Sequence, residues 1–401
     1  MDSTISHIPP FSYWQIQLQQ ADVVVIGGGL VGLTAAASMA LARPWARVVV
    51  LEQGLMPDGA SVRNAGFACF GSPSELVEDS QRRPPDQIAQ LVALRVEGLR
   101  RLRELLGDAA IGYQPTGGYD LLLPGHAPVV ETLADWNARL RPIFGADAFI
   151  PVNPWPAAWP FDRSAFAGAV ALPHEGLIDT GRLGEALLRR AALAGVRWVG
   201  GQTVERIERH PDGFRLAVAG ADGRPYSWQA PQVALCTNAT AARLRPELDV
   251  QPGRGQVWLT EPLDQLNWTG AFHVDAGYTY FRPVGDRLLI GGGRNLDFEG
   301  EATAEHGFNP IVDTWLGGLL RQALLPLQRV EIAERWSGIM GFTGSGLPIV
   351  RELEPGLAAG VGLNGMGVAL GSLVGEAVAD LLLSRPTGAL LRVVSSVHEA
   401  H

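Results

Sequence analysis

The sequence DVVVIGGGLVG, residues 22–32, decides the fold of this chain. Residues 22–26 form a short β-branched run that is typical of a buried strand. Residues 33–43 are rich in Ala, Leu and Met, as in a helix that ends before Pro44, and residues 47–51 (RVVVL) repeat the strand pattern. The order strand, glycine turn, helix, strand predicts a βαβ unit whose two strands are parallel.

The glycines of this unit have the spacing GxGxxG, which predicts a dinucleotide-binding site. Gly27 allows the tight turn, Gly29 lets the backbone approach a pyrophosphate, and Gly32 lets the helix pack closely on the strand. Glu52 lies about 20 residues beyond the last glycine, where it can accept hydrogen bonds from the adenosine ribose. The helix N-terminus would offer free N–H groups to the phosphates, so the ligand is FAD or NAD. The predicted contacts of this unit are Gly27, Gly29, Leu30, Val31, Gly32, Glu52 and Gln53.

Composition and charge exclude several classes of protein. The chain has 401 residues, of which 47% are hydrophobic, and a net charge of -9, so it is long enough for two or three domains. The longest basic cluster, at residues 100–103, has the spacing of a solvated helix face, and we expect no nucleic-acid partner. Cys69 and Cys236 are the two cysteines, neither in a CxxC motif, which favours a reducing compartment and leaves no predicted metal site.

The N-terminus carries no basic region followed by an apolar run, and no stretch of 18 uncharged apolar residues exists. We therefore expect a cytoplasmic protein without a transmembrane segment. The chain also contains no lysine. Further predicted elements are helices at 87–106, 180–194 and towards 383, strands at 196–199, 214–218 and 232–236, and a hairpin of residues 278–282 and 287–290.

A second motif, SVRNAGFACFGSPSEL at residues 61–76, is too apolar for a surface loop and too rich in glycine for a helix or strand. With it, the chain resembles the D-amino-acid-oxidase-like (DAO) superfamily of FAD-dependent oxidoreductases, which includes glycine oxidase, sarcosine oxidase and glutamylputrescine oxidase. The resemblance covers about residues 21–383. Its motifs are GGGLVG with Glu52, GASVRNAGF at 59–67, HEGLIDTGRL at 174–183, WSG at 336–338 with GLPI at 346–349, and GLNGMGVAL at 362–370.

The resemblance implies that FAD is the cofactor and that the second motif passes under the flavin. Binding is expected to be non-covalent, because Cys69 is more typical of a small buried hydrophobe than of a flavin attachment site. In this second motif the implied roles are Ser61, Arg63 and Asn64 near the pyrophosphate and ribityl chain, Ala65, Gly66 and Ala68 as small residues against the ring, and Phe67 and Phe70 as walls of the ring. Other implied contacts are Val204, Thr237, Asn238, Gly338, Gly365, Met366, Gly367 and Val368. Thr237-Asn238 departs from the Thr-Gly or Gly-Ala turn that is usual in the family.

The implied fold class is α/β, with a Rossmann-like FAD-binding domain interleaved with a substrate domain built on an antiparallel sheet. The expected division is an N-terminal arm at 1–20, the FAD-binding domain at 21–84, 160–245 and 337–392, and the substrate domain at 85–159 and 246–336. The arm would pack on the outside or against a partner subunit, so an oligomer is possible.

The implied function is oxidation of the C–N bond of an amine or amino-acid-like substrate, by hydride transfer to the flavin N5 and reoxidation by oxygen or another acceptor. Two alternatives stay open: a dehydrogenase of a hydroxy acid or polyol phosphate, and a non-catalytic flavin-binding subunit of a complex. Sarcosine oxidases use a lysine near the flavin to activate oxygen. Since this chain has no lysine, either an arginine takes this role or the reaction with oxygen is slow, and we expect the slow reaction.

The substrate pocket is expected to contain Tyr280, Arg294 and Met340. Met340 stands where amino-acid-oxidising relatives have the arginine of a WxGxR motif, and methionine cannot anchor a carboxylate. Either the substrate has no adjacent carboxylate, or the anchor has moved to Arg294, after three glycines, with Arg282 a weaker candidate. Tyr280 would supply a hydroxyl in both cases. We therefore expect glycine and D-alanine to be poor substrates.

Overall fold

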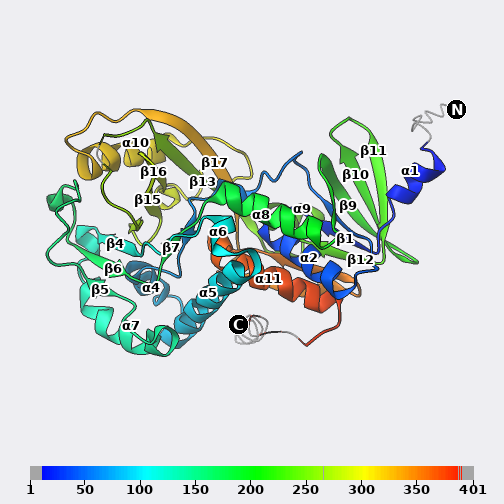
Figure 1. Cartoon of the computed structure of the whole chain (residues 1–401), viewed down its shortest axis with the longest axis horizontal. Coiled ribbons are helices and arrows are strands. Elements are labelled where there is room, and N and C mark those ends of the chain that lie inside the picture. Colours follow the sequence, from blue (N-terminus) through cyan, green and yellow to red (C-terminus); the bar gives the residue numbers. More distant parts are fainter. Residues whose placement is uncertain (1–10, 265, 387, 389, 391–401) are drawn as a thin grey trace.

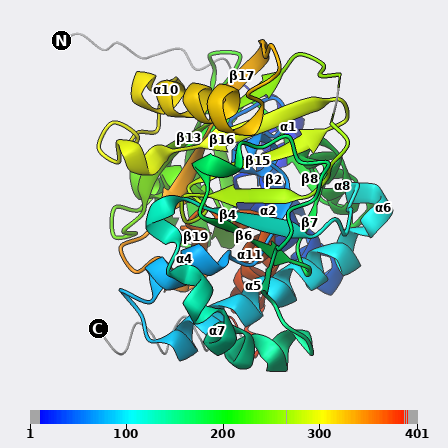
Figure 2. The same cartoon turned by 90° about the vertical axis from the view of Figure 1, so that its left-hand side faces the viewer.

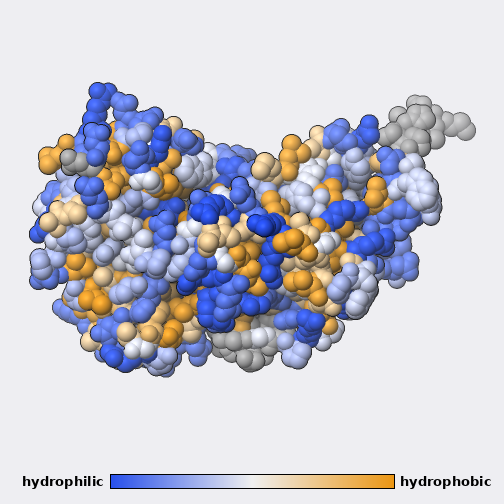
Figure 3. Space-filling view, in the orientation of Figure 1, coloured by the Kyte–Doolittle hydropathy of each residue, from blue (hydrophilic) through white to orange (hydrophobic). Residues whose placement is uncertain are grey.

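The structure is a computed structural model. It describes residues 11–264, 266–386, 388 and 390, so residues 1–10 of the predicted arm and residues 391–392 of the predicted FAD-binding domain lie outside the described residues. The chain forms two lobes, each built on its own large sheet, and the fold is α/β as the sequence predicts (Figure 1). On the face shown in Figure 3, hydrophobic residues are scattered among polar ones over both lobes.

The first lobe is built on a six-stranded sheet in the order β18-β19-β12-β1-β2-β8, in which every strand except β18 runs parallel to its neighbour. The predicted βαβ unit is confirmed, with α2 connecting the neighbouring parallel strands β1 and β2. The strands are β1 (Val23–Ile26), β2 (Val48–Leu51), β8 (Arg197–Val199), β12 (Gln232–Leu235), β18 (Ile349–Glu354) and β19 (Leu357–Val361).

Both faces of this sheet are buried, which explains its continuous runs of Val, Ile and Leu. Val25 and Val50 pack on one face against α2 (Leu30–Ala42), α8 (Thr180–Leu193) and α11 (Gly367–Leu382). Val24 and Val49 pack on the other face against a three-stranded antiparallel sheet. That sheet contains β9 (Gln202–His210), β10 (Gly213–Gly220) and β11 (Pro225–Ala230).

A short helix, α1 (Tyr13–Leu18), lies at the outer end of the three-stranded sheet (Figure 1). The Phe11 ring contacts the Tyr226 ring of β11 at 5.5 Å, whereas Tyr13 and Trp14 are mostly exposed. The described part of the N-terminal arm therefore lies on the outside of the molecule.

The second lobe is built on an eight-stranded sheet in the order β17-β13-β16-β15-β14-β4-β6-β5, antiparallel except for the pair β14 and β4. The predicted hairpin is its pair β15 and β16. The strands are β4 (Gly118–Leu122), β5 (Ile150–Pro151), β6 (Gly168–Leu172), β13 (Gln251–Thr260), β14 (Ala271–Val274), β15 (Thr279–Val284), β16 (Arg287–Gly292) and β17 (Ile332–Phe342).

Alternate residues of this sheet point to opposite faces. Phe272, Phe281 and Ile290 pack on the outer face, which α10 (Pro310–Gly318) covers in Figure 2. Their neighbours His273 and Tyr280 therefore point to the inner face, towards the first lobe.

The remaining helices are α3 (Ala60–Arg63), α4 (Pro73–Asp79), α5 (Pro85–Leu106), α6 (Asp108–Ile111), α7 (Val129–Phe144) and α9 (Ala241–Leu244). Helix α5 packs along α11, and β3 (Phe67–Ala68) pairs with β7 (Gly176–Leu177). Strand β6 and part of β17 belong to the predicted FAD-binding stretches, but they hydrogen-bond in the eight-stranded sheet of the second lobe. The division into domains stays a prediction. No helix of the described residues is long and apolar enough to cross a membrane.

Candidate active site

The glycine turn between β1 and α2 is held by close backbone packing. Gly27 has a positive φ of 99°, and a Cβ there would lie 2.7 Å from the carbonyl oxygen of Cys236. A Cβ on Gly32 would collide with the carbonyl oxygen of Gly27, so the helix lies directly against the turn. Gly29 caps α2 without a side-chain acceptor, and Leu30 N donates to Ser61 Oγ at 2.9 Å. Ser61 therefore occupies one donor of this N-terminus, and the other N–H groups of the first turn of α2 could meet an anion.

Glu52, the acidic residue directly after β2, stabilises this turn by hydrogen bonds. Glu52 is 8% exposed, and its carboxylate accepts hydrogen bonds from Gly28 N at 2.7 Å and Gly54 N at 3.0 Å. The Oγ1 of Thr237, next in sequence to the Cys236 that packs on Gly27, is buried without a partner among the described residues. An open helix end, close glycines and an unpaired hydroxyl fit a bound pyrophosphate.

Other predicted contacts of the dinucleotide lie around this turn. Val31 is buried in the first turn of α2, Gln53 is exposed beyond Glu52, and Val204 lies on β9 with its side chain half-buried against the core. Asn238 has a positive φ of 46°, and its Oδ1 accepts hydrogen bonds from Gly362 N and Leu363 N. The Asn238 amide oxygen thus connects the turn after β12 to residues 362–363, which lie in the glycine-rich loop before α11.

The expectation that the second motif holds no helix or strand is wrong, because it contains most of α3, all of β3 and the start of α4. Between α3 and β3 it forms a turn that local side chains hold. Asn64 Nδ2 donates to Ala60 O at 3.0 Å and Ser61 O at 2.9 Å, and its Oδ1 accepts from Gly66 N at 2.8 Å. Arg63 pairs with Asp58 and donates to the carbonyl of Ser337 at 3.3 Å. The turn is therefore built by local hydrogen bonds before any ligand is considered.

Two small residues of this motif are explained by protein packing. A Cβ on Gly66 would collide with the carbonyl oxygen of Ile178, and Ala68 is buried in the helix-side core of the first lobe. Ala65 and Phe67 instead line the cavity described below. The prediction that Phe70 walls the ring is wrong: its side chain is fully buried and contacts the Phe144 ring at 4.7 Å.

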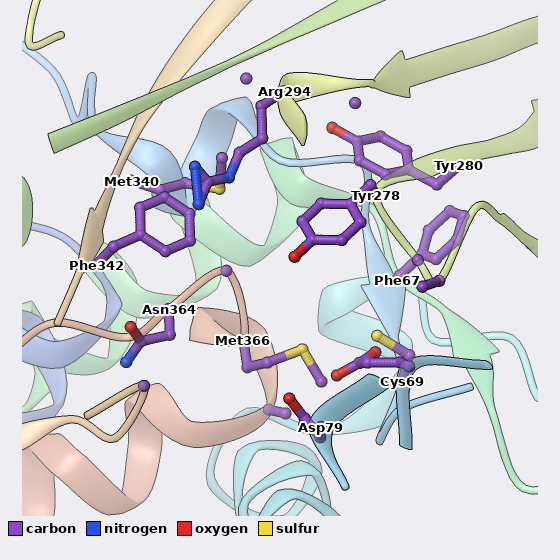
Figure 4. A pocket seen from close by; sticks show the side chains of 18 of the residues that line it. Phe67, Cys69, Asp79, Tyr278, Tyr280, Arg294, Met340, Phe342, Asn364 and Met366 are labelled. Carbon is purple, nitrogen blue, oxygen red and sulfur yellow. The ribbon is translucent and has the colours of Figure 1, made fainter. Parts of the chain in front are cut away.

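A cavity of about 820 Å³ lies between the second motif, the inner face of the eight-stranded sheet and the start of α11 (Figure 4). In Figure 4, Arg294, Met340 and Phe342 gather on one side of the cavity, Phe67 and Cys69 on the other, and Tyr278 lies between them. The predicted residues that line it are Arg63, Asn64, Ala65, Phe67, Tyr280, Arg294, Gly338, Met340, Gly365, Met366 and Val368. Gly367 begins α11, whose N-cap Met366 offers no side-chain acceptor.

Arg294 is one of the half-buried cations that line this cavity. Its guanidinium carbon stacks 3.7 Å from the centroid of the Phe342 ring and 4.8 Å from that of Phe298. It makes no hydrogen bond or ion pair with the residues that the structure describes, and burial lowers the pKa of Arg294. Arg282, by contrast, lies outside the lining and donates from Nη1 to Gly66 O and Ile178 O. Of the two candidate anchors for a carboxylate, Arg294 therefore lines the cavity and Arg282 does not.

Two tyrosines of β15 and its entry also line the cavity. Tyr278 donates from its hydroxyl to Glu78 Oε1 at 3.1 Å, and burial raises the pKa of Tyr278 to about 12. Burial also raises the pKa of Tyr280 to about 12, so both phenols stay protonated at neutral pH. A Cβ on Gly291 would lie 2.9 Å from the Tyr280 ring, which shows that the ring lies over this glycine of β16.

Sequence analysis missed several lining residues. Phe342 lies two residues after Met340 on β17, so the period of two could have placed both on one face. Arg83 also lines the cavity and donates a hydrogen bond to the carbonyl oxygen of Ser345. Glu75, Asp79, Arg95 and His273 also line the cavity, and no sequence pattern marks them.

Fold and site together fit one class of protein, which would bind a dinucleotide at the glycine turn of a Rossmann-like unit, beside a cavity under an antiparallel sheet. A family model described as FAD dependent oxidoreductase (DAO) matches residues 22–381. The chain therefore belongs to the DAO family of FAD-dependent oxidoreductases.

Individual relatives agree with this assignment. Glycine oxidase of Geobacillus kaustophilus (strain HTA426) is 30% identical over 388 residues, covering 91% of this chain and 94% of the relative. Probable oxidoreductase OrdL of Rhizobium meliloti (strain 1021) is 27% identical over 393 residues, covering 92% and 84%. The crystal structure of glycine oxidase from Geobacillus kaustophilus superimposes with a TM-score of 0.73 at 25% identity, covering 92% of this chain and 96% of that chain.

Proposed function

We propose that this FAD-dependent oxidoreductase oxidises the C–N bond of an amine that also carries a carboxylate. The observation that carries the proposal is the Arg294 guanidinium, which faces the cavity and has no acidic partner among the described side chains. Glu301 acts on Arg294 only at longer range, because its carboxylate pairs with Arg254. A half-buried guanidinium without a direct partner is costly, and a substrate carboxylate would offset this cost. Similarity to a glycine oxidase supports an amino-acid-like substrate.

Each pocket residue has a distinct role in this proposal. Arg294 binds the carboxylate with two parallel N–H donors, and stacking on Phe342 holds its guanidinium flat. Met340 forms part of the apolar wall, which excludes water from the reacting carbon. The Tyr280 phenol stays protonated, and its hydroxyl donates a hydrogen bond to the substrate. FAD, when bound, accepts the hydride from the carbon next to the amine.

FAD is proposed to bind non-covalently. Cys69 lines the cavity, but burial raises the pKa of its thiol well above the usual value, with Glu175 and Glu75 adding to the effect. The reactive thiolate is therefore disfavoured. We expect acid precipitation to release all yellow colour into the supernatant, and flavin that stays with the denatured protein would contradict this.

The test of the function is anaerobic bleaching of the flavin by matched sets of amino acids, their decarboxylated amines and the corresponding hydroxy acids. We expect an amine that bears a carboxylate to reduce the flavin fastest. Fast reduction by hydroxy acids, with no reduction by any amine, would overturn the proposal in favour of C–O oxidation. A flavin that no compound reduces would favour a non-catalytic subunit.

A further inference from the structure

A histidine that the pocket roles leave unused lies beside Tyr280 on the inner face of the eight-stranded sheet. His273 on β14 pairs in register with Tyr280 on β15 and with Asp120 on β4. Its side chain is 5% exposed and lines the cavity, and its ring meets the Phe67 ring edge-on at 5.3 Å. His273 is therefore a deeply buried polar group in direct contact with the cavity.

The ring of His273 is oriented by a buried carboxylate. Its Nε2 lies 2.7 Å from Glu175 Oε2, and Glu175 is 1% exposed. The other carboxylate oxygen accepts from Phe70 N at 3.3 Å, and a Cβ on Gly118 would collide with Glu175. The carboxylate is thus fixed by its surroundings and fixes the imidazole in turn.

The second ring nitrogen of His273 is free to react. Nδ1 makes no hydrogen bond with any residue that the structure describes. It is also absent from the fully buried side-chain atoms that lack a partner, so Nδ1 keeps some accessible surface. When Nε2–H donates to Glu175, the neutral ring carries its lone pair on Nδ1. Because the His273 side chain lines the cavity, Nδ1 is the nitrogen that we assign to a bound substrate.

We propose that His273, oriented by Glu175, accepts the proton that an ammonium substrate must lose before its C–N bond is oxidised. This inference rests on the proposed function. An N–H bond of the ammonium breaks, an Nδ1–H bond forms, and the positive charge moves to the imidazole. No electron is transferred in this step, which leaves a neutral amine whose lone pair supports the departure of the hydride.

The charges around His273 favour this transfer. Burial alone lowers the pKa of His273, but Glu175, Asp120 and Glu75 together raise it above the ordinary value. A higher pKa brings the imidazole closer to the pKa of an amine and makes it a better acceptor. The ionisable groups near it are Glu175, Asp120, Tyr280, Cys69, and Glu75 with its partner Arg95. Among the described residues, no such cluster is arranged to hold a metal ion.

The test is the limiting rate of anaerobic flavin reduction, measured by stopped flow between pH 6 and pH 10 with the best amine substrate. In the wild type the rate should rise with pH through a pKa above about 6.5. In His273→Gln we expect a rate about 100-fold lower at neutral pH, recovering only near the pKa of the free amine. In Glu175→Gln the rise should move to lower pH, because the carboxylate no longer raises the pKa of His273.

A second readout does not depend on turnover. In the FAD-loaded protein, NMR titration of labelled histidines should show a pKa above about 6.5 that disappears in His273→Gln and falls in Glu175→Gln. His210→Gln, on β9 outside the cavity lining, is the matched control and should leave the rate profile unchanged.

The outcomes separate this inference from the proposed function. If amines reduce the flavin but His273→Gln lowers the rate by the same factor at every pH, His273 is not the proton acceptor. If no amine reduces the flavin, the proposed function itself is wrong. Should His273→Gln fail to fold or to bind FAD, the direction of the Glu175→Gln shift decides, and an unshifted profile overturns the inference.

Discussion

Replacing Arg294 by Met should weaken binding of a carboxylate-bearing substrate and leave its decarboxylated analogue unaffected. The Arg294 guanidinium is half-buried, already stacked 3.7 Å from the Phe342 ring centroid, and has no other acceptor among the described side chains. A charge-assisted hydrogen bond in such a place contributes about 1.5–3 kcal/mol. At about 1.4 kcal/mol per factor of ten, the Kd should rise about 10- to 150-fold.

The assay is the dependence of the anaerobic flavin-reduction rate on substrate concentration, which gives Kd and the limiting rate separately. Arg294→Lys keeps the charge but loses the flat, two-pronged geometry, so we expect an intermediate loss. The matched control is Arg335→Met, because Arg335 also stacks on an aromatic ring, Phe308 at 4.2 Å, but lies outside the cavity lining. Equal losses for the acid and for its decarboxylated analogue would refute the assignment of Arg294 as the anchor.

Three other outcomes are expected. Gly29→Val should give colourless apoprotein, because even a Cβ at this position lies 2.9 Å from Ser61 Oγ at the open end of α2; a yellow variant with wild-type FAD content would contradict this. Gly98→Ala should lower the unfolding free energy by about 1–3 kcal/mol in urea titrations, because its Cβ would collide with the Ala369 carbonyl where α5 crosses α11. The control Gly318→Ala has nothing within 4 Å and should gain up to about 1 kcal/mol, so equal effects would refute the packing argument. Reduced enzyme should reoxidise slowly in air, since the chain has no lysine, and rapid reoxidation followed by flavin absorbance would count against this.

The glycine turn and its neighbours could be predicted because their signal is local. Strand β1, the turn and α2 follow one another within about 20 residues. Gly27 and Gly32 have close backbone neighbours, as the tight turn and the close helix require, whereas the role of Gly29 towards a pyrophosphate stays a prediction. Phe67 and Phe70 show where local reasoning ends. The two are three residues apart in one motif, yet Phe67 faces the cavity and Phe70 packs into a separate core. Nothing in their spacing distinguishes these surroundings.

Residues that depend on tertiary contact could not be predicted. The ring of His273 is fixed by Glu175, which lies 98 residues earlier in the chain, so neither residue carries a recognisable spacing. Gly66 was predicted to be small because of a ligand, whereas the carbonyl of Ile178 already requires a glycine there. The types of these residues can be read from the sequence, but the reason why each stands at its position depends on the packing of segments that are distant in the chain.

The order of strands in the six-stranded sheet has a consequence for biosynthesis. The glycine turn leaves the ribosome before β12 and β19, which lie on the other side of β1 in the sheet, and before α11, which bounds the cavity. Roughly 300 residues separate β2 from the end of β19, which translation at about 5–20 residues per second covers in about 15–60 s. The sheet is thus incomplete during that interval, and the cavity can enclose the cofactor only after α11 has been synthesised.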